Sequence, residues 1–377
     1  MIKSLLNIIK EIKFFFSSLN IIIDSKNENP KIIFFSENKV YQKFSKSIID
    51  LVTLMYPNQI YYISIDKEDK ITNPGVRNYF INRFLLNFIF NNLKAKNLFL
   101  TVTDLGNNLI RKTNKIDNYI YFFHSPVSTT KNYTSQAFDN YDTIMCIGQF
   151  QIDEIRSREF INKLNKKNLI PAGYFYFDYL LKKINHNIKP NQILIAPSWN
   201  KNMKNFINEN FIELIGILIE NRFKVIFRPH PEHFKRAKTT LNYIKNKFSN
   251  AAFELDSDID NIKSMEKAKC LITDSSGISI EYMIVLNRPV LYLDEYDKIH
   301  NSEYSDYENL KTIDHDIKEN FGYIFKKQDF NRMDYIINDS LKVFHKKLPE
   351  LKNFVNNKYF NFGNTQQFLS SYLKKII

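Results

Sequence analysis

Short apolar runs alternate with helix-length amphipathic segments along almost the whole chain. Nearly continuous runs of Ile, Leu, Val, Phe and Tyr are typical of parallel strands that are covered on both faces. The strand-like runs are 31–35, 60–65, 97–103, 118–123, 143–147, 168–172, 192–196, 224–227, 251–255, 270–273 and 289–293. Segments 76–93 and 206–220 show the clearest helical periodicity between them. The pattern predicts an α/β protein built on doubly wound parallel sheets.

A polar stretch with little periodicity, 182–191, separates two halves of this pattern and contains Pro190. Such a stretch is typical of a linker between domains. We therefore predict an N-terminal Rossmann-like domain over 23–185 and a C-terminal one over 186–377, which ends in a helical segment. Ligands of doubly wound sheets bind beyond the carboxyl ends of the strands, so two such domains facing each other would form a binding cleft.

The first 22 residues repeat apolar side chains at helical spacing, with lysines beside them. Two interpretations stay open: a helix that lies on an anionic membrane surface, or an ordinary amphipathic helix packed on a domain or partner. Lys10, Glu11 and Lys13 interrupt the run, which is shorter than the ~18 apolar residues that a membrane span needs. With no small-residue cleavage site either, we expect a cytoplasmic protein, with peripheral membrane attachment as one option.

The formal net charge of +13 favours anionic partners such as nucleotides, acidic lipids or phosphate-rich polymers. Nucleic acid is not expected, since the chain has no zinc-finger spacing, recognition-helix pattern or RNA-binding aromatic motif. Its two cysteines, Cys146 and Cys270, lie in separate apolar runs and are predicted to be buried thiols. No metal site is expected, because His230 and His233 lack a third ligand nearby in the sequence.

The loop Arg228–Pro231 directly follows a short apolar strand. Two prolines stiffen it and fix the direction of His230 between them. Arg228 carries a planar, permanently charged fork suited to phosphate oxygens, and His230 can donate a proton to a leaving phosphate. We predict a phosphate-binding and catalytic loop; the alternative is a surface turn that ends a strand.

A second loop, Asp274-Ser275-Ser276-Gly277, leads from a strand into an apolar helix. Free N–H groups and the positive end of the helix dipole attract phosphate at such a position. The two hydroxyls add donors and Gly277 allows close approach of the ligand. Glu281, one turn later, could accept hydrogen bonds from a ribose, or it is an ordinary first-turn carboxylate. The alternative for this loop is simple N-capping of the helix by Asp274 or Ser275, which is compatible with phosphate binding.

His124 ends the strand-like run 118–123 and precedes Ser125-Pro126. A histidine at the carboxyl end of a strand is well placed as a general base toward an acceptor hydroxyl. A polar strand exit without catalytic role is the alternative.

Several of these motifs follow one another in an order that carries a family resemblance: Ile193–Trp199, Arg228–Pro231, Thr273–Ser276, Glu281 and Arg288-Pro289. In this order they resemble the CDP-glycerol glycerophosphotransferase family of teichoic-acid and capsule biosynthesis, over roughly residues 115–300. The resemblance implies a GT-B-like fold and a CDP-linked alditol donor, with Ser198 and Trp199 on the donor side. It also implies that His124 matches the family's N-domain histidine.

By this resemblance, His124 would deprotonate an acceptor hydroxyl on a polysaccharide or lipid-linked molecule, and CMP would leave without need for a cofactor or metal. Three alternatives remain at this point. They are a GT-B glycosyltransferase that uses a nucleotide-sugar, a nucleotide-sugar epimerase, and a catalytically silent binding protein of a polymer-export complex.

Overall fold

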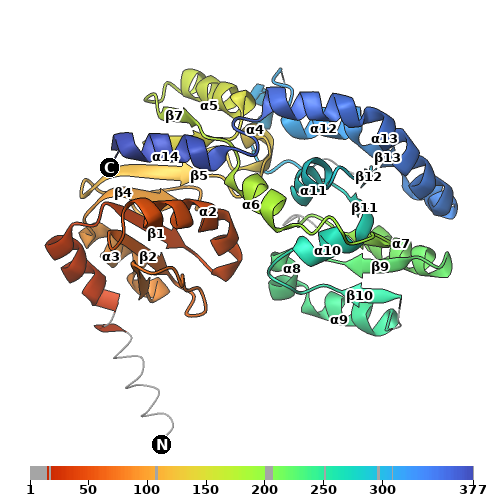
Figure 1. The fold of residues 1–377 in the computed structure, drawn as a ribbon, viewed down its shortest axis with the longest axis horizontal. Helices are drawn as coiled ribbons and strands as arrows, with labels where there is room; N and C mark the ends of the chain where they lie inside the picture. The colour runs from red at the N-terminus through yellow and green to blue at the C-terminus, as the bar shows by residue number, and fades with distance from the viewer. Residues whose placement is uncertain are drawn as a thin grey trace, which may run out of the picture. The chain divides into compact units, whose positions relative to one another are not determined.

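The computed structural model describes residues 15–16, 18–106, 109–199, 207–249, 252–294, 298–307 and 309–376. These residues form two compact units, drawn in Figure 1. Most of the N-terminal helix predicted over 1–22 lies outside the described residues, while 18–28 is helical. Among the described residues, no helix is long and apolar enough to cross a lipid bilayer.

The first unit is built on a seven-stranded sheet with the order β3-β2-β1-β4-β5-β6-β7. Every pair of neighbouring strands is parallel. The strands are β1 Ile32–Ser36, β2 Ile60–Ser64, β3 Val76–Phe80, β4 Ala95–Leu100, β5 Ile116–Phe122, β6 Thr143–Cys146 and β7 Asn168–Pro171. The larger helices of this half are α2 Lys39–Met55, α3 Leu86–Asn92, α5 Gln149–Ile161 and α6 Phe175–Lys183.

The second unit repeats this topology with six parallel strands in the order β10-β9-β8-β11-β12-β13. They are β8 Gln192–Ile195, β9 Lys224–Phe227, β10 Phe253–Leu255, β11 Ala268–Thr273, β12 Val290–Leu293 and β13 Tyr323–Phe325. Its helices are α7 Glu209–Glu220, α8 Pro231–Arg236, α9 Lys238–Lys247, α10 Ile262–Lys267, α11 Ile278–Leu286, α12 Ile313–Phe321 and α13 Met333–Lys358. In both sheets the strand order reverses once, between β1 and β4 and between β8 and β11, and ligands bind at such points.

The predicted class, two doubly wound α/β domains, is confirmed, and each strand-like run of the sequence overlaps a strand. The helix predicted over 76–93 is wrong at its start. Residues 76–80 form β3, which pairs in parallel with β2, and only Leu86–Asn92 is α-helical. Valine and aromatic residues favour the extended conformation of a strand. Pairing with the open edge of β2 therefore makes residues 76–80 a strand and not the start of a helix. Both cysteines are free and buried, as predicted.

The two units are interleaved in sequence, whereas the sequence analysis expected two contiguous domains. Residues 125–132 belong to the second unit, and 359–377 return to the first. There helix α14 (Thr365–Ile376) packs against α2, blue beside red in Figure 1. Gly173 permits this return, because a Cβ atom there would meet the Phe360 carbonyl oxygen at 2.2 Å. A close backbone contact of this kind does not change the hydrophobic periodicity, so the sequence could not predict the return of the chain to the first unit.

Candidate active site

The loops that follow β8 and β11 lie side by side at the switch point of the second sheet. The Asp274 carboxylate accepts hydrogen bonds from the backbone N–H of Ser198 at 2.8 Å and from its hydroxyl at 2.7 Å. The hydroxyl of Thr273 donates to the carbonyl oxygen of Ala196 at 2.7 Å. The structure therefore brings Ser198 and Asp274 together, and Asp274 connects the loop after β8 with the loop after β11.

The N-terminus of helix α11 is open. Gly277 is its N-cap residue and supplies no side-chain cap, while Asp274 bonds to Ser275 N–H before the helix begins. The hydroxyl oxygen of Ser275 is buried without a hydrogen-bond partner among the described residues. A Cβ atom on Gly277 would lie 2.3 Å from the Ser125 hydroxyl oxygen, so glycine is needed for close packing here. An uncapped helix start with a buried, unused hydroxyl is a good site for an anion.

A cavity of about 490 Å³ opens beside this helix start, lined by residues of the second unit. Its volume lies in the usual range for small-molecule sites. The lining residues are Lys131, Asn132, Asp274, Ser275, Ser276, Ser279, Ile280, Tyr292, Asp294, Lys298, Asp314, His315, Lys318, Glu319 and Lys326. Four lysines and four carboxylates make the wall strongly polar, which suits a ligand that carries both phosphate and hydroxyl groups.

Asp314, near the start of α12, fixes the segment that follows His124 onto the second unit. Its carboxylate accepts from the N–H of Ser128 at 2.8 Å and from the side-chain amide of Asn132 at 3.1 Å. Burial raises the pKa of Asp314, and these hydrogen bonds together with the nearby Lys131 charge oppose that rise. The segment 125–132, which includes helix α4 (Thr129–Asn132), thereby contributes Lys131 to the cavity wall.

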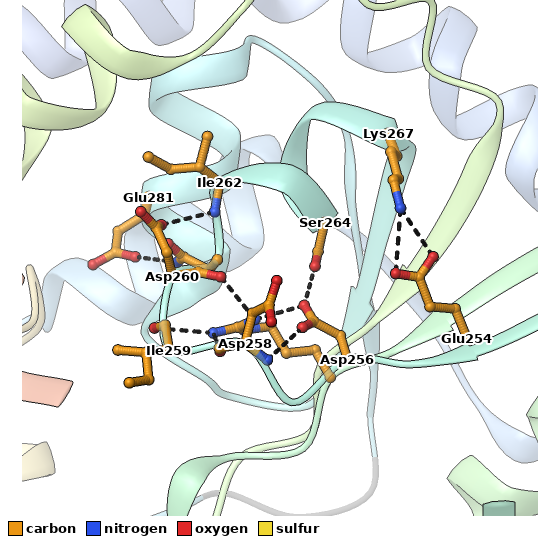
Figure 2. Close-up of polar contacts among 11 residues, drawn as sticks. Glu254, Asp256, Asp258, Ile259, Asp260, Ile262, Ser264, Lys267 and Glu281 are labelled. Carbon is orange, nitrogen blue, oxygen red and sulfur yellow. Dashed lines mark hydrogen bonds and ion pairs between the residues drawn. The ribbon is translucent and has the colours of Figure 1, made fainter. Parts of the chain in front are cut away.

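Arg228 does not present the free phosphate fork that the sequence suggested. Its Nη1 lies 2.5 Å from an oxygen of Asp256 and 3.2 Å from the carbonyl oxygen of Asp260. Its Nη2 donates to the carbonyl oxygen of Asp258 at 2.8 Å. Figure 2 shows the rest of this network, in which the Ser264 hydroxyl also donates to Asp256. The guanidinium therefore closes the loop that follows β10, because a buried charge is stabilised by a partner of opposite charge.

The sequence predicted His230 as a proton donor to a leaving phosphate, and the structure places its side chain at the surface. Its Nδ1 accepts a hydrogen bond from the backbone N–H of Glu232 and so caps helix α8. The backbone N–H of His230 donates to Nδ1 of the buried His233. The plane of the His230 ring is inclined by 23° to that of Trp199, and the two centroids lie 6.4 Å apart. His233 thus serves the helix cap, and Trp199 and His230 form one aromatic pair.

Glu281, which the sequence analysis connected with a ribose, is buried on α11. It accepts a hydrogen bond from the side-chain amide of Asn261 at 3.5 Å, and Figure 2 shows the carboxylate beside the loop that precedes α10. This contact ties α11 to that loop. Glu281 is not among the residues that line the cavity.

His124 belongs to the first unit, one peptide bond before the segment that joins the second. The rings of Tyr41, Phe44 and Tyr133 surround its imidazole, with centroids 5.4, 5.9 and 6.2 Å away. Its Nδ1 is buried without a hydrogen-bond partner among the described residues. Burial lowers the pKa of His124 to about 4, so the ring is neutral at physiological pH. A neutral imidazole is the form that accepts a proton.

Sequence reasoning missed the lysines of the cavity wall. Lys131, Lys298, Lys318 and Lys326 come from four separate segments of a chain that is rich in lysine throughout. Asp314 was also missed, because in the sequence it resembles an ordinary first-turn carboxylate of α12. A weak signal existed for Lys298, which follows the carboxyl end of strand β12 by a few residues.

Comparisons with known proteins agree with this geometry. The sequence model described as CDP-Glycerol:Poly(glycerophosphate) glycerophosphotransferase matches residues 90–329, more than half of the chain. No match among curated protein sequences reaches significance.

Solved structures share the fold at low identity. The wall teichoic acid polymerase TagF matches with a TM-score of 0.64 at 14% identity, covering 99% of this chain and 96% of that one. A putative UDP-N-acetylglucosamine 2-epimerase from Listeria monocytogenes gives 0.59 at 10%, covering 92% and 96%. The UDP-GlcNAc 2-epimerase of Methanocaldococcus jannaschii, in complex with UDP-GlcNAc and UDP, gives 0.57 at 13%, covering 92% and 99%. The likeness confirms the GT-B-like architecture, and the family match identifies the activity: the chain belongs to the CDP-glycerol glycerophosphotransferase family and is a transferase of that type.

Proposed function

We propose that this protein transfers glycerol phosphate, or a related alditol phosphate, from a CDP-linked donor to a hydroxyl of a cell-surface polysaccharide or lipid-linked acceptor, releasing CMP. The observation that carries the donor site is the open start of helix α11 at the switch point of the second sheet. There the buried, unpartnered Ser275 hydroxyl, Ser276 and the lysine-lined cavity converge. The donor's diphosphate would accept hydrogen bonds from these groups.

The chemical step is an in-line displacement at phosphorus. The neutral imidazole of His124 takes the proton of the acceptor hydroxyl, whose oxygen attacks the phosphorus that carries the alditol. The bond from that phosphorus to the bridging oxygen breaks, and its electron pair leaves with CMP. His230, aligned by its cap on α8 and by Trp199, would act as the acid on the donor side.

We further propose that transfer needs neither a cofactor nor a divalent metal. Lysine ammonium groups and a helix start can hold the charge that a metal ion holds in other phosphoryl transfers. Four lysines line the cavity, which supports this assignment. Chelation with EDTA should leave the rate of CMP release unchanged, and restoration of a lost rate by added Mg²⁺ would contradict it.

The donor is tested by binding, since a ligand that binds the native state raises its melting temperature. We expect CDP-glycerol or CDP-ribitol to stabilise the protein more than UDP-GlcNAc or GDP-mannose. Turnover with an acceptor should release CMP, and His124→Asn should abolish it while donor binding persists. Because the pKa of His124 is about 4, kcat/KM should show no acidic decline near pH 6.5.

An enzyme that acts on nucleotide-sugars, a glycosyltransferase or an epimerase, is the second candidate, because an epimerase of the same fold holds UDP-GlcNAc and UDP. A glycosyltransferase would attack an anomeric carbon and release UDP or GDP. Chromatography of the products separates the two, since CMP is expected only from the proposed reaction. Conversion of a nucleotide-sugar without any acceptor would point to an epimerase.

For a lipid-linked acceptor, we propose that part of the first unit contacts an anionic membrane. Phe84 and Phe88 are 96% and 54% exposed, and Phe16, two residues before the helical stretch 18–28, is 62% exposed. The Ser18 hydroxyl donates to the carbonyl oxygen of Phe80, which places that helix next to the end of β3. Exposed aromatic side chains favour the interfacial layer of a bilayer.

Flotation with vesicles that contain phosphatidylglycerol tests this surface. The double variant Phe84→Ser/Phe88→Ser should bind the vesicles less than wild type. Phe160→Ser is the matched control, because Phe160 is 86% exposed on α5. Equal flotation of all three proteins would refute the membrane contact.

A further inference from the structure

Lys298 differs from the other charged residues that line the cavity. It lies shortly after β12, is partly buried, and has no hydrogen-bond or ion-pair partner among the described residues. Lys318, in the same wall, is paired with Asp294 at 2.8 Å and holds the pKa of that carboxyl below its usual value. One wall therefore carries a neutralised lysine and an uncompensated one.

The carboxylates nearest to Lys298 are already engaged. The Asp274 carboxylate accepts hydrogen bonds from Ser198, Thr273 and the Ser275 N–H, and Asp314 accepts from two groups of the segment 125–132. Burial lowers the pKa of Lys298, and the charges of Asp274 and Asp314 oppose that shift. A partly buried ammonium without a direct counter-ion is costly unless an anion arrives to pair with it.

We propose that Lys298 binds the donor phosphate that becomes the phosphate of CMP, and that it compensates the negative charge which appears there during transfer. The inference rests on the proposed function. In the donor each phosphate carries about one negative charge; when the bridging P–O bond breaks, its electron pair gives the CMP phosphate a second one, which stays there until the leaving oxygen takes a proton from His230. An ammonium fixed beside that oxygen stabilises the product-like state more than the substrate.

Binding measurements can separate these two states. By calorimetry, Lys298→Met should weaken CMP about thirty-fold and CDP-glycerol about five-fold, because the phosphate beside Lys298 carries one more negative charge in CMP than in CDP-glycerol. Cytidine, which has no phosphate, should bind equally to both proteins. The rate of CMP release at saturating donor should fall about a hundred-fold. Lys298→Arg should restore most of the affinity for both ligands and most of the rate, since it keeps the charge.

Lys342→Met is the matched control, because Lys342 is exposed on α13 and does not line the cavity. It should leave all four quantities unchanged. If Lys298→Met and the control give the same CMP affinity, the inference is wrong.

The pH dependence of CMP affinity gives a second, independent test that uses the unmodified protein. Since burial lowers the pKa of Lys298, affinity should decline on the alkaline side before an ordinary lysine would lose its charge. Lys298→Arg should shift this decline upward, because a guanidinium stays protonated. The other ionisable groups of the cavity are Lys131, Asp274, Tyr292, Asp294, Asp314, His315, Lys318, Glu319 and Lys326, and they are the same in both proteins. A decline that is identical in both refutes the inference.

The outcomes also distinguish a failure of the role proposed for Lys298 from a failure of the proposed function. If wild-type protein neither binds CDP-glycerol nor releases CMP, the proposed function fails. If wild-type protein does both and Lys298→Met does them equally well, only the role of Lys298 fails. Should Lys298→Met not fold, as judged by circular dichroism, the pH comparison of wild type with Lys298→Arg decides.

Discussion

The two strand-end loops of the second unit look alike in sequence and differ in the structure. Each follows a buried parallel strand, and each carries groups suited to phosphate, Arg228 and His230 in one, Ser275 and Ser276 in the other. The first is closed on itself, because the guanidinium of Arg228 pairs with Asp256 and with backbone carbonyls. The second is open, because the buried Ser275 hydroxyl has no partner among the described residues and Ser275 lines a cavity.

The contrast shows that a side chain's chemistry indicates a site only when its hydrogen-bonding capacity is unused. We therefore expect Arg228 to contribute to stability and Ser275 to binding, although a motif search would give them the same role. The closed loop still serves the site indirectly, because it leads into His230 and the Trp199 ring. Substitutions in the two loops should therefore separate stability from affinity.

The largest effect is expected for Arg228→Met. It leaves the carboxylate of Asp256, 5% exposed, without its cation, and loss of one partner of a buried pair costs about 3–5 kcal/mol of unfolding free energy. Urea denaturation measures the change, with Arg332→Met as control, because Arg332 is 60% exposed and pairs with Asp329 at the surface. The affinity of the folded variant for CDP-glycerol should change less than three-fold. Unchanged stability with a large loss of affinity would restore the phosphate-fork interpretation.

An intermediate effect is expected for the double variant Ser275→Ala/Ser276→Ala. Two hydroxyl donors disappear from the open loop, so CMP and CDP-glycerol should bind about ten- to thirty-fold more weakly, at about 1 kcal/mol for each lost hydrogen bond. The melting temperature should hold or rise slightly, because the unpartnered Ser275 hydroxyl is removed from a buried position. Calorimetry and thermal unfolding measure both, with the exposed Ser249→Ala as control. A destabilised protein with normal affinity would reverse the assignment of the two loops.

The smallest effect is expected for Glu281→Gln. Its carboxylate accepts from Asn261, and the amide oxygen of glutamine can accept the same bond. Stability should fall by less than about 1 kcal/mol, and the preference for CMP over its 2′-deoxy analogue should stay constant. If the preference for CMP over its 2′-deoxy analogue disappears in the variant, Glu281 binds the ribose, as the sequence suggested.

Apart from β3 and β13, the sequence allowed the strands to be predicted, together with both sheets and the loops after β8, β9 and β11, because buried parallel strands leave long apolar runs. It misassigned residues 76–80, where a five-residue edge strand and a helix start share the same apolar residues. It also expected contiguous domains, since nothing in the periodicity of 125–132 indicates that Asp314 holds this segment.

The sequence by itself determined the architecture of this protein and the family of its reaction, because periodicity and ordered motifs are local properties. Tertiary structure decided which polar groups are free to act. Whether Arg228 meets a phosphate or Asp256, and whether Lys298 has a counter-ion, depends on partners that folding brings from distant segments. Hydrogen-bonding capacity is limited, so a group that is satisfied inside the fold is no longer available to a ligand.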